Sequence, residues 1–311
     1  MDVKLHTKLK HKILSYYFSG GWKNAFKSGK IYSLYYVDLF AGDGFCFCNE
    51  IDEDLEKVLP KNLSERKWKP SYFDLMKYAN ESNFNLKCVF NDIEENNIKS
   101  LTGEINRVGY SHFVKEYFCK DANEIYQEIL NIIEKPNKPS LFYIDPTNHS
   151  HLNFSTIETI AQFKDEKTGR RPELIINLML NSIYMAFKRG LNEEDLDSIN
   201  RFFGTDFKRE EIKNIIKDPS EKSYKTFLNI YLEKLQNLGY YCNYHLINST
   251  KSNSPIYYLL FATYNKQIFS WYKNINSYVQ NLEEEWIKSN YKIKTMSEAK
   301  REGQTFLFDY Q

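Results

Sequence analysis

The sequence predicts an α/β fold built on a seven-stranded, mostly parallel sheet that ends in an antiparallel hairpin. Five short apolar runs alternate with helical patterns of about 10–15 residues across positions 31–180, and this alternation is typical of βαβ units. Most of these runs end near an acidic residue, where ligands bind in parallel sheets. Two further apolar runs, 240–247 and 255–264, follow one another so closely that one of these strands must run antiparallel.

Composition supports one large domain in a reducing compartment. Of the 311 residues, 42% are hydrophobic and 27% are charged, which favours a sizeable core over wholesale disorder. No apolar run approaches the roughly 18–20 residues of a membrane span, and lysines at positions 4, 8, 10 and 12 interrupt any apolar leader. Five cysteines, an odd number without framework spacing, indicate reduced thiols and a cytoplasmic protein.

The first 70 residues are predicted to form a helix, a strand and a loop-rich insertion. A helix is predicted over residues 8–18, where apolar residues recur at helical spacing, and Gly20 and Gly21 are expected to end it. The run 31–40 is apolar and partly β-branched, which is typical of a buried parallel strand. Residues 45–70 are polar and charged and include two prolines, so we predict a loop-rich insertion there.

The same reasoning assigns the later elements. Helical periodicity marks the helices, apolar runs mark the strands, and Pro136 and Pro139 separate a helix from the strand that follows. Ser71 and Ser155 are expected to cap their helices. In chain order the predicted elements are helix 71–83, strand 86–91, helix 94–108, strand 112–118, helix 123–134, strand 140–144, helix 154–163, strand 174–180, a helical insertion over 181–220, helix 224–238, strands 240–247 and 255–264, and a last helix over 270–289.

Three parts are predicted along the chain: a basic helical arm over 1–30, a central α/β domain over 31–268, and a C-terminal helix and tail over 269–311. The arm holds seven lysines against one acidic residue, a local charge of about +6 that can contact phosphates. The alternative is an ordinary solvated helix face. The candidate nucleic-acid residues are Lys4, Lys8, Lys10 and Lys12.

The first candidate site lies where the strand over 31–40 runs into a glycine turn. Ligands bind outside the carboxyl ends of parallel strands, and glycines let the backbone approach a ligand closely. No third glycine follows Gly44, so a dinucleotide is disfavoured, and Asp38 and Asp43 favour an amino group or a sulfonium. The alternative is a plain turn between a strand and a helix. The candidate cofactor-binding residues here are Asp38, Phe40, Ala41, Gly42 and Gly44.

Two further carboxylates follow the next strands. Asp92 ends the second strand, where an acidic residue accepts hydrogen bonds from ribose hydroxyls. Asp121, beside Ala122, follows the third strand and is a candidate acceptor for the exocyclic amino group of adenine. The alternative for both aspartates is a helix N-cap, and the two roles can coexist.

The fourth predicted strand ends in the run Asp-Pro-Thr-Asn at positions 145–148. Proline fixes this turn and leaves the aspartate facing the expected cleft. The run resembles the Asp/Asn-Pro-Pro-aromatic loop of amino-methyltransferases, which implies that its aspartate holds a target amine. Because the aromatic residue is missing here, His149 or Phe154 is the candidate for stacking a base. The candidate catalytic residues are Asp145, Pro146 and Asn148.

No metal site is predicted. The pair His149-x-His151 lacks matching cysteines or acids, and Cys46-x-Cys48 is interpreted as two loop thiols. The sequence also contains neither a phosphate-binding Walker loop nor a hydrolase nucleophile elbow.

Several motifs together resemble known families. The order of elements is similar to that of the Rossmann-like class I S-adenosylmethionine (SAM) methyltransferases, and the run 38–44 resembles motif I of cytosine-C5 DNA methyltransferases. The Pro-Cys nucleophile of that subclass is missing, since no proline is followed by cysteine. A closer resemblance is to the three-Cys-motif partner family (TcmP), bacterial proteins with a methyltransferase-like core. The matching runs are 6–16, 38–44, 70–71, 121–123, 144–146, 202–205 and 256–262.

The TcmP resemblance implies SAM as cofactor and a role beside nucleic acid in bacterial defence or mobile-element systems. Together with the strand-end acids and the basic arm, it favours a SAM-dependent methyltransferase that acts on DNA or RNA, with a co-encoded protein as a further partner. One alternative is a catalytically inactive methyltransferase-like module that binds nucleic acid or a partner protein. A less favoured alternative is a nicotinamide-dependent oxidoreductase.

Overall fold

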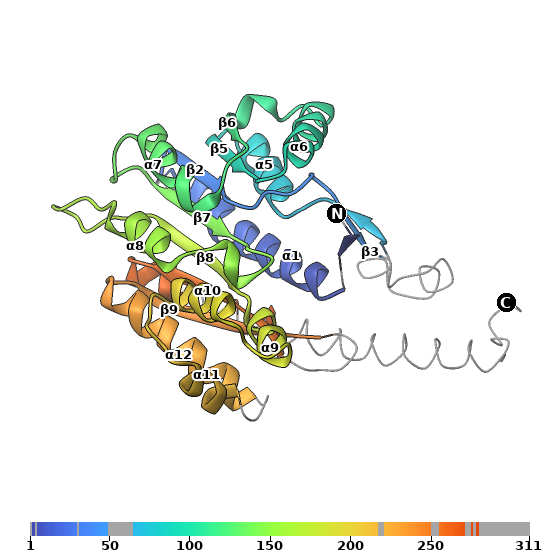
Figure 1. The fold of residues 1–311 in the computed structure, drawn as a ribbon. Coiled ribbons are helices and arrows are strands. Elements are labelled where there is room, and N and C mark those ends of the chain that lie inside the picture. Colours follow the sequence, from blue (N-terminus) through green and yellow to red (C-terminus); the bar gives the residue numbers. More distant parts are fainter. Residues whose placement is uncertain are drawn as a thin grey trace, which may run out of the picture.

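A seven-stranded sheet forms the centre of the molecule (Figure 1). The structure, a computed structural model, describes residues 2–3, 5–29, 31–48, 65–216, 221–249, 255–270, 275 and 278–279. The strand order across the sheet is β6-β5-β2-β7-β8-β10-β9. The strands are β2 (Ser33–Asp38), β5 (Asn85–Asn91), β6 (Val114–Phe118), β7 (Ser140–Ile144), β8 (Glu173–Leu178), β9 (Tyr241–Asn248) and β10 (Pro255–Thr263).

Strand direction confirms the predicted mostly parallel sheet. Strand β2 pairs in parallel with β5 and β7, β5 with β6, and β7 with β8. Strand β10 runs opposite to the other six strands of this sheet, since it pairs antiparallel with both β8 and β9. The carboxyl ends of β2, β5, β6 and β7 therefore meet at one edge, where parallel sheets bind ligands.

Helices cover both faces of the sheet (Figure 1). Alternate residues of each strand point to opposite faces and divide the buried side chains into two clusters. One cluster packs against the helices α1 (Leu5–Tyr17), α2 (Lys23–Lys27), α5 (Tyr72–Glu81) and α6 (Glu95–Arg107). The other packs against α7 (Ala122–Ile133), α8 (Phe154–Gln162), α9 (Leu180–Lys188), α10 (Glu193–Phe203), α11 (Arg209–Ile216) and α12 (Glu221–Asn237).

We predicted that the N-terminal helix ends at Gly20 and Gly21, and this prediction is wrong. A π-helical turn (Phe18–Trp22) carries the chain through Gly20 and Gly21 into α2. Phe18, Trp22 and Phe26 are buried along this path. Burying each large apolar side chain stabilises by about 1.5–3 kcal/mol, whereas a helical glycine costs only about 1 kcal/mol. Tertiary packing therefore outweighs the local preference.

The insertion predicted as loop contains a small second sheet. Strand β3 (Cys46–Cys48) pairs in parallel with β1 (Asp2–Val3) and antiparallel with β4 (Lys67–Trp68). Strands this short leave no period in the sequence, and β1 is distant in the chain. Positions 49–64 of the insertion lie outside the described residues, as does most of the predicted last helix and tail.

Two predicted helix caps differ from the structure. Ser71 stands at the start of α5 but makes no side-chain capping bond there. Its backbone N–H instead donates to Nδ1 of His11 over 3.2 Å. The helix α8 begins after Asn153, so Ser155 lies inside it. Among the residues that the structure describes, no helix has the length and apolarity to cross a membrane.

Candidate functional site

A cavity of about 560 Å³ opens at the carboxyl ends of β2, β5 and β7, beneath the start of α1. It gathers most of the residues that we predicted to form a site. Those that line it are Asp38, Phe40, Ala41, Gly42, Asp92, Asp121, Ala122, Asp145 and Pro146, together with Lys10 of the basic arm. Gly44, Asn148 and the other described lysines of the arm do not line it.

Asp38 ends β2 and supports the turn that follows. It is almost fully buried; Oδ1 accepts a hydrogen bond from the Phe40 N–H over 3.1 Å, and Oδ2 lies 3.2 Å from the Tyr36 hydroxyl. Burial raises the pKa of Asp38 to about 8, and the nearby Asp145 carboxylate adds to the effect. Asp38 is therefore largely neutral at pH 7 and becomes an anion easily when a cation lies beside it.

Asp92 ties the glycine turn to the start of α6. Its Oδ2 accepts from the Gly42 N–H over 2.9 Å, and Gly42 holds a positive φ of 68°. Its Oδ1 accepts from the Glu94 N–H and from the Asn97 amide, over 2.9 and 3.0 Å. A carboxylate offers about four acceptor positions, so about one remains for a ligand hydroxyl. Both roles considered for Asp92 can therefore coexist.

Gly44 serves helix packing rather than the cavity wall. Its φ of 83° favours glycine, and a Cβ there would lie 3.3 Å from Cβ of Glu104 and 3.4 Å from Cα of Leu101. Both neighbours belong to α6. The missing side chain therefore lets α6 approach the turn, and the cofactor role that we predicted for Gly44 is indirect at most in this geometry.

Asp121 caps α7 and also lines the cavity. Its side chain accepts from the Asn123 N–H over 2.7 Å, as an N-cap does. Ala122, the first residue of α7, is buried beside it. Across the same rim, Ile93 is 66% exposed although it lines the cavity. Ile93 thus offers an apolar side chain that a ligand in the cavity can contact.

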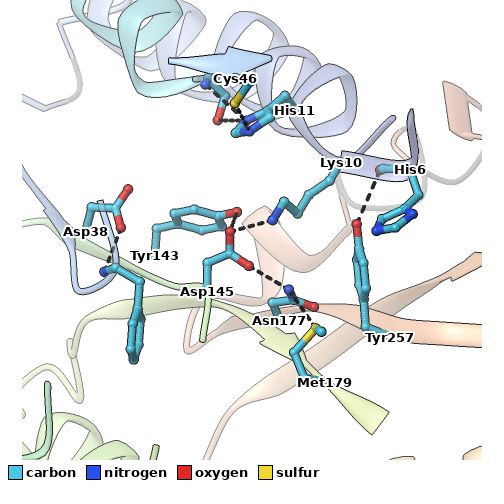
Figure 2. A network of polar contacts seen from close by, with 12 residues as sticks. His6, Lys10, His11, Asp38, Cys46, Tyr143, Asp145, Asn177, Met179 and Tyr257 are labelled. Atoms are coloured by element: carbon cyan, nitrogen blue, oxygen red, sulfur yellow. Dashed lines mark hydrogen bonds and ion pairs between the residues drawn. The ribbon is translucent and has the colours of Figure 1, made fainter. Parts of the chain in front are cut away.

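Asp145 is the centre of a polar network that joins three elements (Figure 2). Oδ2 forms an ion pair with the Lys10 ammonium of α1 and accepts from the Tyr143 hydroxyl over 2.9 Å. Oδ1 accepts from the Asn177 amide at the end of β8, over 2.6 Å. Burial alone would raise the pKa of Asp145, but Lys10, Asn177 and Tyr143 together hold it below its usual value. Asp145 is therefore a fixed anion.

The residues after Asp145 do not provide the stacking surface that we predicted. His149 is buried, with Nδ1 2.8 Å from Ser182 Oγ and Nε2 3.0 Å from Ser198 Oγ. Phe154 is buried against Tyr231. Neither lines the cavity. Aromatic side chains that do line it near Asp145 include Tyr143, Tyr257 and His6, and the rings of His6 and Tyr257 lie edge to face at 5.9 Å.

Asn148 acts inside its own loop. Its side chain accepts from the Ser150 N–H over 3.2 Å and caps a short 3₁₀ turn (His149–His151). The structure therefore places Asn148 behind the cavity wall, where it can shape the loop. Pro146 is buried at the wall itself.

Two of the four lysines that we predicted to contact nucleic acid are buried. Lys8 is buried, with its ammonium 5.2 Å from the Trp68 ring and 2.8 Å from the Glu65 carbonyl oxygen. Lys10 is buried in the Asp145 network, and Lys12 is half-buried. Lys4 lies outside the described residues. The long aliphatic stems pack against apolar surface while each buried ammonium reaches an oxygen, so Lys8 and Lys10 hold α1 in place.

Sequence reasoning missed His11 and Cys46, which face one another at the cavity wall. His11 Nε2 lies 3.4 Å from Cys46 Sγ. Burial lowers the pKa of His11 to about 3 and raises that of Cys46 to about 12, so both are neutral at pH 7. The pair is therefore not an activated thiolate. No group of three or more His, Cys, Asp or Glu side chains able to hold a metal occurs within the described part of the chain.

The sheet defines the class of fold. Numbered along the chain within the sheet, the strand order is 3-2-1-4-5-7-6, which is the Rossmann-like fold of class I methyltransferases. Protein LPL1258 from Legionella pneumophila, assigned to family DUF519, matches with a TM-score of 0.52, 10% identity, 91% of this chain and 93% of its own.

Two other solved structures match more loosely. The O-methyltransferase TomG from Streptomyces achromogenes, in complex with SAM, has a TM-score of 0.36 and 8% identity over 78% of each chain. An rRNA methylase from Streptococcus thermophilus has a TM-score of 0.34 and 11% identity over 78% of this chain and 95% of its own. At such identities the likeness concerns the fold alone. No family model matches the chain, and no curated protein matches it.

Proposed function

We propose that the chain is a SAM-dependent methyltransferase whose acceptor is a nucleic acid, with transfer in the cavity at the carboxyl ends of β2, β5 and β7. One observation carries the proposal: acidic side chains that follow four successive parallel strands converge on this cavity. They are Asp38, Asp92, Asp121 and Asp145. Such a set attracts a cationic nucleoside and repels a dinucleotide pyrophosphate.

The residues of the cavity suit the parts of SAM one by one. The exposed side chain of Ile93 offers an apolar face for a purine, and Asp121 lies on the same rim for an exocyclic amino group. Asp92 has acceptor capacity left for a ribose hydroxyl, and the exposed carboxylate of Glu94 lies two residues further on. Asp38 is the buried acid that a sulfonium would ionise. SAM, when bound, supplies a methyl group that is already activated.

Because SAM is already activated, the main catalytic role of the protein is to position the acceptor against the methyl group. Asp145 cannot serve as a strong base, because its pKa is held below the usual value. As a fixed anion it orients a donor N–H and stabilises positive charge that develops on the acceptor. Pro146 fixes the adjoining backbone, and Asn148 shapes the loop from behind. We assign the stacking of an acceptor base to Tyr257 and His6.

Calorimetry with SAM and with S-adenosylhomocysteine tests the cofactor. We expect wild type to bind both, and Ile93→Ser to weaken binding by about 10-fold, in line with the loss of one buried apolar side chain. Met185→Ser is the matched control, because Met185 is 47% exposed on α9 and does not line the cavity. Absence of binding by wild type, or equal weakening by both variants, contradicts the proposal.

A second candidate function is a methyltransferase-like module that binds nucleic acid or a partner protein without transfer. The observation that favours it is the Asp145 network, in which Lys10, Tyr143 and Asn177 already occupy the carboxylate. Incubation with radiolabelled SAM and total RNA, DNA or the co-encoded protein separates the two functions. Incorporated label supports transfer, and bound SAM without incorporation under all three conditions supports the module.

We also propose membership of the TcmP family and, with it, a cytoplasmic role in a bacterial defence or mobile-element system. Support comes from the run 38–44 and from the run 144–146, both of which lie at the cavity. Co-purification of the tagged chain from its native host tests this role. Recovery of the co-encoded partner protein is expected, and its absence counts against the role.

A further inference from the structure

Cations and aromatic rings alternate on a small ribbon at the mouth of the cavity. Strands β3 and β4 pair antiparallel, with Phe47 opposite Lys67. We call the five residues Phe45, Phe47, Arg66, Lys67 and Lys69 the rim ribbon. The Lys67 and Lys69 ammonium groups lie 4.3 and 4.4 Å from the Phe45 ring centre, and the Arg66 guanidinium lies 5.4 Å from that of Phe47.

The two faces of the ribbon differ. Cys46 and Cys48 are buried on the inner face, where Cys46 lies at the cavity wall. Side chains alternate along a strand, so Phe45 and Phe47 share the opposite face with Lys67 and Lys69. Lys67 is exposed, while Phe45, Phe47, Arg66 and Lys69 are half-buried. This is the face that a partner can reach.

Among the residues that the structure describes, two of the three cations of the ribbon have no ion-pair partner. Lys69 pairs with Glu104 of α6, and Glu65 is an exposed acid next to Arg66. Arg66 and Lys67 form no ion pair with any residue that the structure describes. A guanidinium that lies over an aromatic ring is well suited to contact a phosphate or a base.

The ribbon and the cavity share one residue. Phe45 lines the cavity, as does Pro70, which directly follows the last cation of the ribbon. The cavity lining carries further acids besides the Asp145–Lys10 pair, among them Asp43, Asp92 and Asp121, so phosphates are repelled from it while a neutral base is not. A nucleic acid that delivers a base to the cavity must therefore hold its phosphates outside, on the cationic rim.

We infer that the rim ribbon binds an unpaired nucleic-acid strand and leads one base into the cavity. This inference rests on the proposed function. The phosphates lie along Arg66, Lys67 and Lys69, and a neighbouring base stacks on the Phe47 ring and the Arg66 plane. The strand is unpaired, because a base inside a duplex cannot enter the cavity without being extruded. Alternating cations and rings are the usual platform for single strands.

Fluorescence anisotropy with labelled oligonucleotides tests the inference. We expect wild type to bind a single-stranded RNA or DNA oligomer more tightly than the matching duplex, with affinity that falls as salt rises. Lys67→Glu should weaken binding by about 10-fold at low salt and reduce the slope of log affinity against log salt by about 0.7 or more, the value for one single-strand phosphate contact. Phe47→Ala should weaken binding about 10-fold, because a base–aromatic stack contributes about 1–3 kcal/mol.

Lys138→Glu is the matched control. Lys138 also lies over an aromatic ring, 5.5 Å from the Tyr35 ring centre, but just before β7 at the opposite end of the sheet. It should change affinity less than twofold. Equal losses from Lys67→Glu and Lys138→Glu, tighter binding of duplex, or equal binding of polyglutamate would overturn the inference.

Binding of S-adenosylhomocysteine separates this inference from the proposed function. Each ribbon variant should retain it, which also shows that the variant is folded. If the ribbon variants weaken oligonucleotide binding but wild type binds no cofactor, the methyltransferase proposal is contradicted and the ribbon remains a nucleic-acid binding surface. If wild type binds the cofactor but the ribbon variants bind the oligonucleotide as tightly as wild type does, only the inference about the ribbon is contradicted.

Discussion

The two halves of the cavity are built in different ways. In the half around Asp38 and Asp92, the carboxylates accept bonds mainly from backbone N–H groups that follow the two neighbouring strands β2 and β5. In the half around Asp145, the partners are side chains from α1, β7 and β8, and Lys10 is 135 positions away in the chain. The first half is therefore set by the turns after two paired strands, and the second depends on the docking of the N-terminal helix.

The difference has a consequence for charge. Asp38 is buried without a cation, and its pKa is raised to about 8. Asp145 is buried with a cation, and its pKa is lowered. The half around Asp38 can therefore accept a cationic ligand group, whereas the Asp145 carboxylate is already paired with the Lys10 ammonium.

Removing the Lys10 ammonium should cause the largest loss of stability. Lys10→Met leaves the Asp145 carboxylate, whose side chain is only 18% exposed, without its cation. Breaking a buried ion pair costs about 3–5 kcal/mol, so we expect the free energy of unfolding in guanidinium at pH 7 to fall by about 3 kcal/mol. The double variant with Asp145→Asn removes both charges and should recover at least half of this loss. A single-variant loss below about 1 kcal/mol would show that the pair contributes little.

The two aspartates should also respond to pH with opposite sign. The folded-state pKa of Asp38 is raised, so its contribution to stability is fully present below its ordinary pKa and is lost as pH rises towards about 8. The folded-state pKa of Asp145 is lowered, so its contribution is present above the ordinary value and is lost as pH falls below it.

Unfolding curves between pH 5 and 8 measure the first effect. Asp38→Asn should flatten the decline by up to about 1.4 kcal/mol per pH unit, the limit for one proton. Glu173, whose pKa burial raises to about 7, contributes in the same direction from outside the cavity, so Glu173→Gln is the control. A decline that Asp38→Asn leaves unchanged would contradict the assignment.

A smaller effect on stability is expected at the glycine turn after β2. Gly44→Ala combines a strained positive φ with a tight contact to α6, and we expect a loss of about 2 kcal/mol in stability. Gly29→Ala has a similar φ of 65° but nothing within 4 Å of the added Cβ, so it should lose only about 1 kcal/mol. Thermal unfolding of the two variants compares them, and equal losses would mean that the approach of α6 does not require the glycine.

The same contrast explains what could be predicted from the sequence. Asp38, Asp92, Asp121 and Asp145 each follow a strand, and parallel strands bring their carboxyl ends together, so the acidic side of the cavity followed from local pattern. The mostly parallel sheet was predictable because strands and helices alternate along the chain.

The remaining features depend on contacts distant in the chain. In the sequence, nothing distinguishes Lys10 from a solvated lysine. Its burial becomes favourable through the ion pair with Asp145, which is distant in the chain. Strands β3 and β4 contain three and two residues, too few for a period, and the π-helical turn exists because three aromatic side chains share a core. The stacking residues were misplaced because His149 and Phe154 have core partners on other helices.

A crystal structure with S-adenosylhomocysteine bound would locate the cofactor site. We expect the nucleoside in the cavity at the carboxyl ends of β2 and β5, with the base against Ile93, a ribose hydroxyl on Asp92 or Glu94, and the sulfur between Asp38 and Asp145. A cavity that stays closed to the ligand at saturating concentration, or a nucleoside bound elsewhere on the chain, would contradict it.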